Sequence, residues 1–159
     1  MNVTIVCIGK LKEHFWTEAT AEYAKRLSRF CTFSVEELKE ERLPEHASLA
    51  QEQAVKEAEG KSILKRLKKD AYVIALDLKG RSMTSENFSE KLQMLGLEGK
   101  SEICFIIGGS LGLSSEVLQR ADERISFSAM TFPHQLMRVI LAEQIYRAFK
   151  SMGGETYHK

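Results

Sequence analysis

The sequence contains no apolar run that approaches the roughly 18 residues needed to span a membrane. Its first segment, Met1 to Gly9, also lacks the charged head and the small-residue cleavage site of a secretory signal peptide. The formal net charge is only +1, so the chain has no global signature of nucleic-acid binding, and a basic patch would have to be local. We therefore expect a cytoplasmic protein with no membrane partner.

Cysteine is scarce as well. Cys7, Cys31 and Cys104 are odd in number and far apart, and two of them lie inside apolar runs. This pattern predicts buried free thiols in a reducing compartment rather than disulfides or catalytic groups. The histidines show no ligand spacing with one another or with the cysteines, so we predict no metal site.

The remaining composition, 43% hydrophobic and 28% charged over 159 residues, fits a globular protein with a core, and we expect residues 1–159 to form a single domain. Apolar spacing predicts alternating elements. Strands are expected at 2–8, 31–38, 71–78, 102–107 and 125–128, and helices at 13–30, 48–67, 84–95, 114–121 and 133–152. Such alternation is typical of an α/β fold with a mostly parallel sheet covered by helices on both faces.

Several residues carry local predictions. Gly60 interrupts a helix, which suggests close approach to another backbone. Ser85 and Ser114 are candidate helix caps, and Pro133 suits the first turn of the last helix because proline lacks an N–H. Beyond Pro133 that helix is apolar over more than one stripe, and we expect it to pack against both the sheet and a second subunit.

Two loops follow strands and precede helices. The turn from Gly108 to Gly112 lets the backbone bend tightly and lets a ligand approach, although a plain strand-to-helix turn explains it equally well. It is neither a dinucleotide fingerprint nor a P-loop. Segment 127–132 could pack a flat ring, or it could be a buried strand with Thr131 as a helix cap. Two loops at neighbouring strand ends are typical of a small-molecule site in an α/β protein.

Arg138 lies one turn after His134, where it could face an anion or an RNA phosphate or form a structural ion pair. Glu143 and Arg147 have the spacing of a pair on a helix surface. The chain ends in Tyr157, His158 and Lys159. Tyrosine can stack on a base, histidine can move a proton and lysine can meet a phosphate, although a polar tail without function is the simpler interpretation.

Together these features resemble the RlmH-type SPOUT methyltransferases, which methylate N3 of a pseudouridine in large-subunit ribosomal RNA. The matching residues are Val3 to Lys10, Glu59-Gly60, Ile74 to Asp77, Ile107 to Gly109, Gly112-Leu113, Ser126 to Ser128, Thr131 to His134, Arg138, Glu143 to Ala148, and Tyr157-His158. The resemblance covers the whole chain. It implies a C-terminal trefoil knot, which no periodicity predicts, and a homodimer that acts on assembled ribosomes at helix 69.

The resemblance also implies a site for S-adenosylmethionine. The matching positions are Leu76, Gly108, Phe127, Ser128, Ala129, Met130, Thr131 and Phe132. For catalysis we expect His158 to remove the N3 proton, Tyr157 to stack on or orient the target, and Arg138 to hold a phosphate or a carbonyl oxygen. His134 is a competing base. Some relatives end in arginine where Lys159 stands, so planar recognition by this position is in doubt.

Two alternatives stay open at this point. The chain could be a ribosome-binding factor that keeps the fold without the reaction, although the intact glycine and tail motifs argue against it. It could also be a methyltransferase acting on a different RNA.

Overall fold

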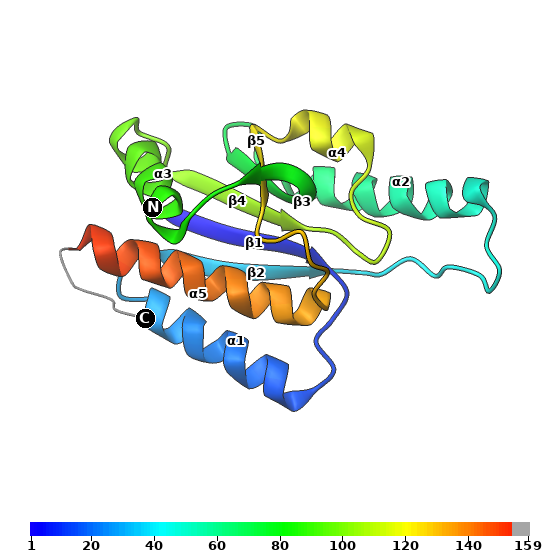
Figure 1. Cartoon of the computed structure of the whole chain (residues 1–159), viewed down its shortest axis with the longest axis horizontal. Helices are drawn as coiled ribbons and strands as arrows, with labels where there is room; N and C mark the ends of the chain where they lie inside the picture. Colours follow the sequence, from blue (N-terminus) through cyan, green and yellow to red (C-terminus); the bar gives the residue numbers. More distant parts are fainter. Residues whose placement is uncertain (154–159) are drawn as a thin grey trace.

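The computed structural model describes residues 1–153 and shows a parallel sheet between helices (Figure 1). In chain order the elements are β1 Asn2–Ile8, α1 His14–Leu27, β2 Thr32–Leu38, α2 Leu49–Arg66, β3 Tyr72–Ser82, α3 Ser85–Leu97, β4 Glu102–Ile107, α4 Ser115–Arg120, β5 Glu123–Ser126 and α5 His134–Met152. The five strands lie in the order β2-β1-β4-β3-β5, and every pair is parallel. The predicted α/β class and parallel sheet are confirmed.

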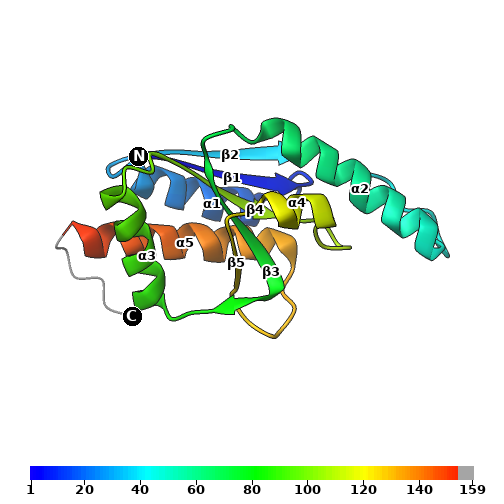
Figure 2. The same ribbon diagram turned by 90° about the horizontal axis from the view of Figure 1, so that it is seen from above.

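The sheet separates two apolar cores. Along β1, Val3, Ile5 and Cys7 pack toward α1, α3 and α5, whereas Val6 and Ile8 pack toward α2 and α4. This alternation follows from the period of two along a strand, and it explains why β1, covered on both faces, is apolar from Ile5 to Ile8. α1 and α5 run side by side in both views of the chain (Figure 1, Figure 2).

The predicted caps are partly confirmed. Ser114 caps α4 by accepting a hydrogen bond from the Val117 N–H. At α3 the prediction of Ser85 was wrong, because Thr84 is the cap and accepts from the Asn87 N–H. Thr84 has the extended backbone that precedes a helix, whereas Ser85 is already helical. Phe88, Leu92 and Leu95, which have the spacing of one helix face, are buried.

Strand β3 differs most from the prediction. We expected this strand at residues 71–78, just before Lys79 and Gly80, but it continues to Ser82. Its pairing with β5 shifts on the way, so that Ile125 aligns with both Leu76 and Arg81. Gly80 lies directly against the backbone of Arg124 and Ile125. The glycine is therefore the place where β5 crosses the extension of β3. The fifth strand is also shorter than predicted, at Glu123–Ser126.

Gly60 packs closely, as predicted, but against a side chain rather than a backbone. A Cβ at this position would overlap the hydroxyl of Ser114. Because Ser114 caps α4, α2 and α4 meet at the cap itself. Both halves of the Glu59-Gly60 pair thus face the segment that follows β4, since Glu59 lies against Gly109.

The described part of the chain, residues 1–153, contains no helix that is long and apolar enough to cross a membrane. Over the same residues the three cysteines are free, and Cys7 and Cys104 are buried. Burial raises the pKa of the Cys7 thiol to about 11 and that of Cys104 to about 12. Both thiols therefore stay protonated near neutral pH, which fits the predicted unreactive thiols.

Candidate functional site

The predicted binding residues meet at the carboxyl edge of the sheet. Ala75 of β3 aligns with Ile106 of β4, and the next residue, Leu76, aligns with Ile125 of β5. Gly108 follows β4 by one residue, and Phe127 follows β5 by one residue. Because these three strands are neighbours and parallel, their following loops leave from one level of the sheet. This is the usual place for a ligand in an open α/β fold.

The glycine turn is fixed by its own tight packing. A Cβ on Gly108 would lie 2.8 Å from Cδ2 of Leu113 and 3.1 Å from the carbonyl carbon and oxygen of Gly112. The Gly112 N–H donates to the Gly109 carbonyl at 3.0 Å, which closes the turn. A side chain at Gly108 would therefore open the turn.

A buried carboxyl group, that of Glu59, packs against this turn. Glu59 is only 4% exposed, and its Oε2 accepts from the Glu41 N–H at 3.1 Å. Its other oxygen, Oε1, would be 2.9 Å from a Cβ on Gly109. Burial raises the pKa of Glu59, and the neighbouring carboxylates of Glu40 and Glu41 raise it further. Sequence reasoning noted Glu59 only through the family resemblance, because its contacts come from a distant turn.

The loop after β5 is held by its own hydroxyl groups. The Ser126 hydroxyl donates to the Ser128 carbonyl at 3.1 Å, and the Ser128 hydroxyl accepts from the Met130 N–H at 3.0 Å. Met130 is 72% exposed. The cap of α5 is Pro133, and no side chain caps that helix. The interpretation of Thr131 as a helix cap was therefore wrong, and Thr131 is an exposed loop residue.

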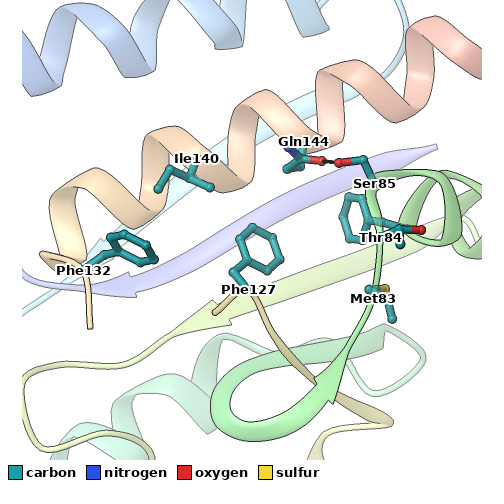
Figure 3. Close-up of a pocket in the computed structure, with 8 residues that line it drawn as sticks. Met83, Thr84, Ser85, Phe127, Phe132, Ile140 and Gln144 are labelled. Carbon is teal, nitrogen blue, oxygen red and sulfur yellow. Dashed lines mark hydrogen bonds between the residues drawn. The ribbon is translucent and has the colours of Figure 1, made fainter. Parts of the chain in front are cut away.

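Two aromatic rings of this loop line a hollow of about 210 Å³ between α3 and α5. Figure 3 shows the rings of Phe127 and Phe132 turned toward the space below α5. The lining residues are Met83, Thr84, Ser85, Phe88, Phe127, Phe132, Ile140 and Gln144. The Ser85 hydroxyl and the Gln144 carboxamide oxygen lie 2.7 Å apart and bridge the two helices. Since Leu76 and Gly108 do not line this hollow, it is at most one end of the predicted site.

Arg138 is 2% exposed and forms an ion pair inside the chain. Its Nη1 donates to Oε2 of Glu37 at 2.7 Å, and its Nη2 donates to the carbonyls of Ile8 and Gly9 at 2.9 and 2.6 Å. Of the two roles that the sequence left open, the structure provides the ion pair. Direct contact with RNA stays a prediction, and it would require these bonds to break. Its buried Nε has no partner within residues 1–153.

Of the remaining candidate residues, some lie within residues 1–153 and the others lie after them. His134 is half-buried, and burial lowers its pKa, helped by the nearby positive charge of Arg138. The nearby carboxylate of Glu40 opposes this shift, and the net lowering of the pKa favours the neutral imidazole, the form that a general base needs. Glu143 and Arg147 form the predicted ion pair, with Nη2 of Arg147 3.0 Å from Oε2 of Glu143.

Tyr157 and His158 lie outside the described residues. No group of three or more potential metal ligands occurs in residues 1–153.

A comparison with family models identifies these elements. The model described as predicted SPOUT methyltransferase matches residues 1–158. The chain belongs to the SPOUT methyltransferase family. The matched residues, 1–158, include the glycine turn and the loop after β5.

Curated relatives and one solved structure agree with the family. Proteins named ribosomal RNA large subunit methyltransferase H are 55% identical in Clostridium kluyveri and 57% identical in Clostridium novyi, each over all of both chains. A solved structure titled a probable methylase family protein from Haemophilus influenzae has a TM-score of 0.54 at 15% identity. The matched region covers 99% of this chain and 70% of the chain in that structure. At that identity the structure supports the fold alone.

Proposed function

We propose that this chain transfers a methyl group from S-adenosylmethionine to N3 of a pseudouridine in helix 69 of large-subunit (23S) ribosomal RNA. The observation that carries the proposal is the identity of 55% or more, over the full length, with relatives whose names state ribosomal RNA large subunit methylation. The choice of pseudouridine N3, of helix 69 and of assembled ribosomes comes from the resemblance of the whole chain to the RlmH-type SPOUT methyltransferases.

The residues at the carboxyl edge fit the methyl donor. Gly108 keeps the turn after β4 free of a side chain, and Phe127 and Phe132 offer aromatic faces for a flat adenine ring. We propose that these residues hold the donor together with Leu76 and residues 128–131. S-adenosylmethionine supplies an activated methyl group when bound. The chain's part is to align it with the base nitrogen, which can remove roughly 7 to 11 kcal/mol of the barrier.

The proton on N3 must be lost for the nitrogen to become a good nucleophile. We propose His158 as the base and Tyr157 as the residue that stacks on or orients the target, with His134 as the competing base. Arg138 acts in this proposal by holding the start of α5 and the end of β1 together, because its donors are bound to Glu37, Ile8 and Gly9. We further propose a single SPOUT domain over residues 1–159, a C-terminal trefoil knot, a cytoplasmic location and a homodimer.

Replacing Gly108 with valine is expected to abolish binding of S-adenosylmethionine. The valine methyl groups would collide with Leu113 and with the Gly112 carbonyl, and the turn would open. Isothermal titration calorimetry should detect no binding heat, while the matched variant Ser110→Val, at an exposed position in the same turn, should bind as the wild type does. Unchanged affinity in a folded Gly108→Val protein would remove this residue from the site.

Mass spectrometry of ribosomal RNA from cells that lack this protein tests the proposed function. We expect one methyl group to be lost from a helix 69 pseudouridine, and the gene supplied on a plasmid should restore it. Loss of a methyl group elsewhere would favour a methyltransferase acting on another RNA. An unchanged modification profile would favour a ribosome-binding factor without catalytic activity.

A further inference from the structure

We propose that residues 9–15, here called the β1–α1 segment, form a contact surface for ribosomal RNA beside the methyl-transfer site. In this proposal Lys10 and Lys12 meet backbone phosphates, and Phe15 stacks on an unpaired base. The inference rests on the proposed function, because it names the part of the protein that meets the substrate of that reaction.

The β1–α1 segment begins beside the glycine turn. Cys7 of β1 aligns with Ile107 of β4, so Ile8 and Gly9 lie level with the residues that open the turn. A Cβ on Gly109 would be 3.4 Å from Cγ2 of Ile8. Figure 1 shows the segment leaving the end of β1 and passing the start of α5 on its way to α1. An RNA strand that reaches the carboxyl edge would therefore meet this segment.

Three hydrogen bonds to two other elements, β2 and α5, hold the segment in place. The Gly9 N–H donates to the Leu38 carbonyl at 2.7 Å, and the Gly9 carbonyl accepts from Arg138 at 2.6 Å. The Leu11 N–H donates to Oε2 of Glu37 at 3.0 Å. The side chains of Arg138 and Glu37 thus hold the segment in place. A loop that is already ordered loses little conformational entropy when a partner binds.

The cations of the segment are available. Lys10 and Lys12 are exposed, and neither forms an ion pair within residues 1–153, whereas Lys68 and Lys91 pair with acidic residues. Two of the nearby acidic groups form ion pairs of their own, because Glu37 pairs with Arg138 and Glu18 with His14. Glu13 and Glu40 are further exposed carboxylates, and Oε2 of Glu40 would lie 3.5 Å from a Cβ on Gly9. Lysines that neutralise phosphates release counterions, so their contribution falls as salt rises.

An exposed aromatic ring lies next to these cations. Phe15 is 60% exposed in the first turn of α1, and its ring centroid is 4.7 Å from that of Trp16, which is half-buried. An exposed ring beside a positive loop is the combination that single-stranded RNA uses, since unstacked bases pack on aromatic faces while cations follow the backbone. The lysines and the ring together favour RNA over an apolar protein partner.

The test compares two triple variants. Lys10→Ala/Lys12→Ala/Phe15→Ala removes the proposed surface. Lys65→Ala/Lys69→Ala/Leu97→Ala removes the same charges and one exposed apolar side chain, 75% exposed, from the opposite, amino edge of the sheet. Equilibrium binding to large ribosomal subunits is measured across a salt series, with S-adenosylmethionine affinity and sedimentation mass measured in parallel.

We expect the first variant to bind ribosomal subunits about 10- to 100-fold more weakly, with a salt slope smaller in magnitude by about 1.4 to 1.8. The control should match the wild type, and both should keep the wild-type affinity for S-adenosylmethionine. If the first variant binds large ribosomal subunits with wild-type affinity, the proposal that this segment contacts RNA is wrong. A change in its sedimentation mass also overturns it and assigns the segment to contact between two copies of the chain. If the wild type binds subunits but transfers no methyl group, the proposed function fails while the surface stands.

Discussion

Replacing Gly80 with alanine is expected to lower the free energy of unfolding by about 3 kcal/mol, which corresponds to a fall in Tm of roughly 6 to 12 °C. The new Cβ would lie 2.7 Å from the backbone nitrogen of Ile125 and 2.8 Å from the carbonyl carbons of Arg124 and Ile125. Backbone atoms cannot move aside as a flexible side chain can. Since β5 is held by its pairing with β3 on both sides of this crossing, the strand has to shift as a whole.

The same substitution is expected to weaken S-adenosylmethionine binding, because Ile125 aligns with Leu76 and is followed closely by Phe127. Thermal unfolding and calorimetry measure the two effects. Gly96→Ala is the matched control: it lies in α3, and its Cβ would meet only the flexible end of Met1, at 3.1 Å. The control should change Tm by a few degrees at most. A Gly80→Ala protein with wild-type Tm would show that β5 does not cross here as described.

Deletion of residues 157–159 is expected to lower the rate of methyl transfer by about 100- to 10,000-fold, the range that general base catalysis supplies. The reason is chemical: Tyr157 and His158 carry the proposed stacking and proton-accepting groups, and the described site has no better candidate than His134. S-adenosylmethionine binding should remain close to wild type, because the predicted donor site, at Leu76, Gly108 and residues 127–132, lies earlier in the chain.

Two point variants separate the possible bases. His158→Ala should lose most of the activity that the deletion loses, whereas His134→Ala should retain activity within a few-fold of wild type. Single-turnover methylation of ribosomal subunits measures both. If His134→Ala abolishes transfer and the shortened chain methylates at the normal rate, the base is His134 and the tail proposal is wrong.

Local patterns predicted the elements well and their contacts poorly. Apolar spacing was sufficient to predict β1, β4 and the inward face of α3. A strand buried on both faces is a continuous apolar run, and a helix buried on one face repeats apolar residues at helical spacing, so both can be read from the sequence. Glycine and proline were less reliable as signals of where an element ends. Gly80 resembles a strand end, yet it is required inside β3 because another backbone passes over it. Such a crossing joins segments far apart in the chain, so no local window contains it.

In the candidate site too, the positions of the loops could be predicted from the sequence, whereas the contacts between distant residues could not. The glycine turn and the loop after β5 were placed correctly at one edge, since carboxyl ends of parallel strands coincide. The partners of Arg138 were not predictable, because Glu37 and Gly9 are distant in sequence. The support of the turn by Glu59 was hidden for the same reason. Isolated charges in a sequence do not reveal which of them are already paired in the fold.

Methyl transfer by the purified protein tests the central claim most directly. Large ribosomal subunits and assembled ribosomes from cells without this protein are incubated with it and with S-adenosylmethionine carrying an isotope-labelled methyl group. The ribosomal RNA is then digested and analysed by mass spectrometry. We expect one labelled methyl group per ribosome, on N3 of a helix 69 pseudouridine, and more of it with assembled ribosomes than with free subunits. Absence of label from the RNA, with a protein that binds both ribosome and donor, would contradict the account.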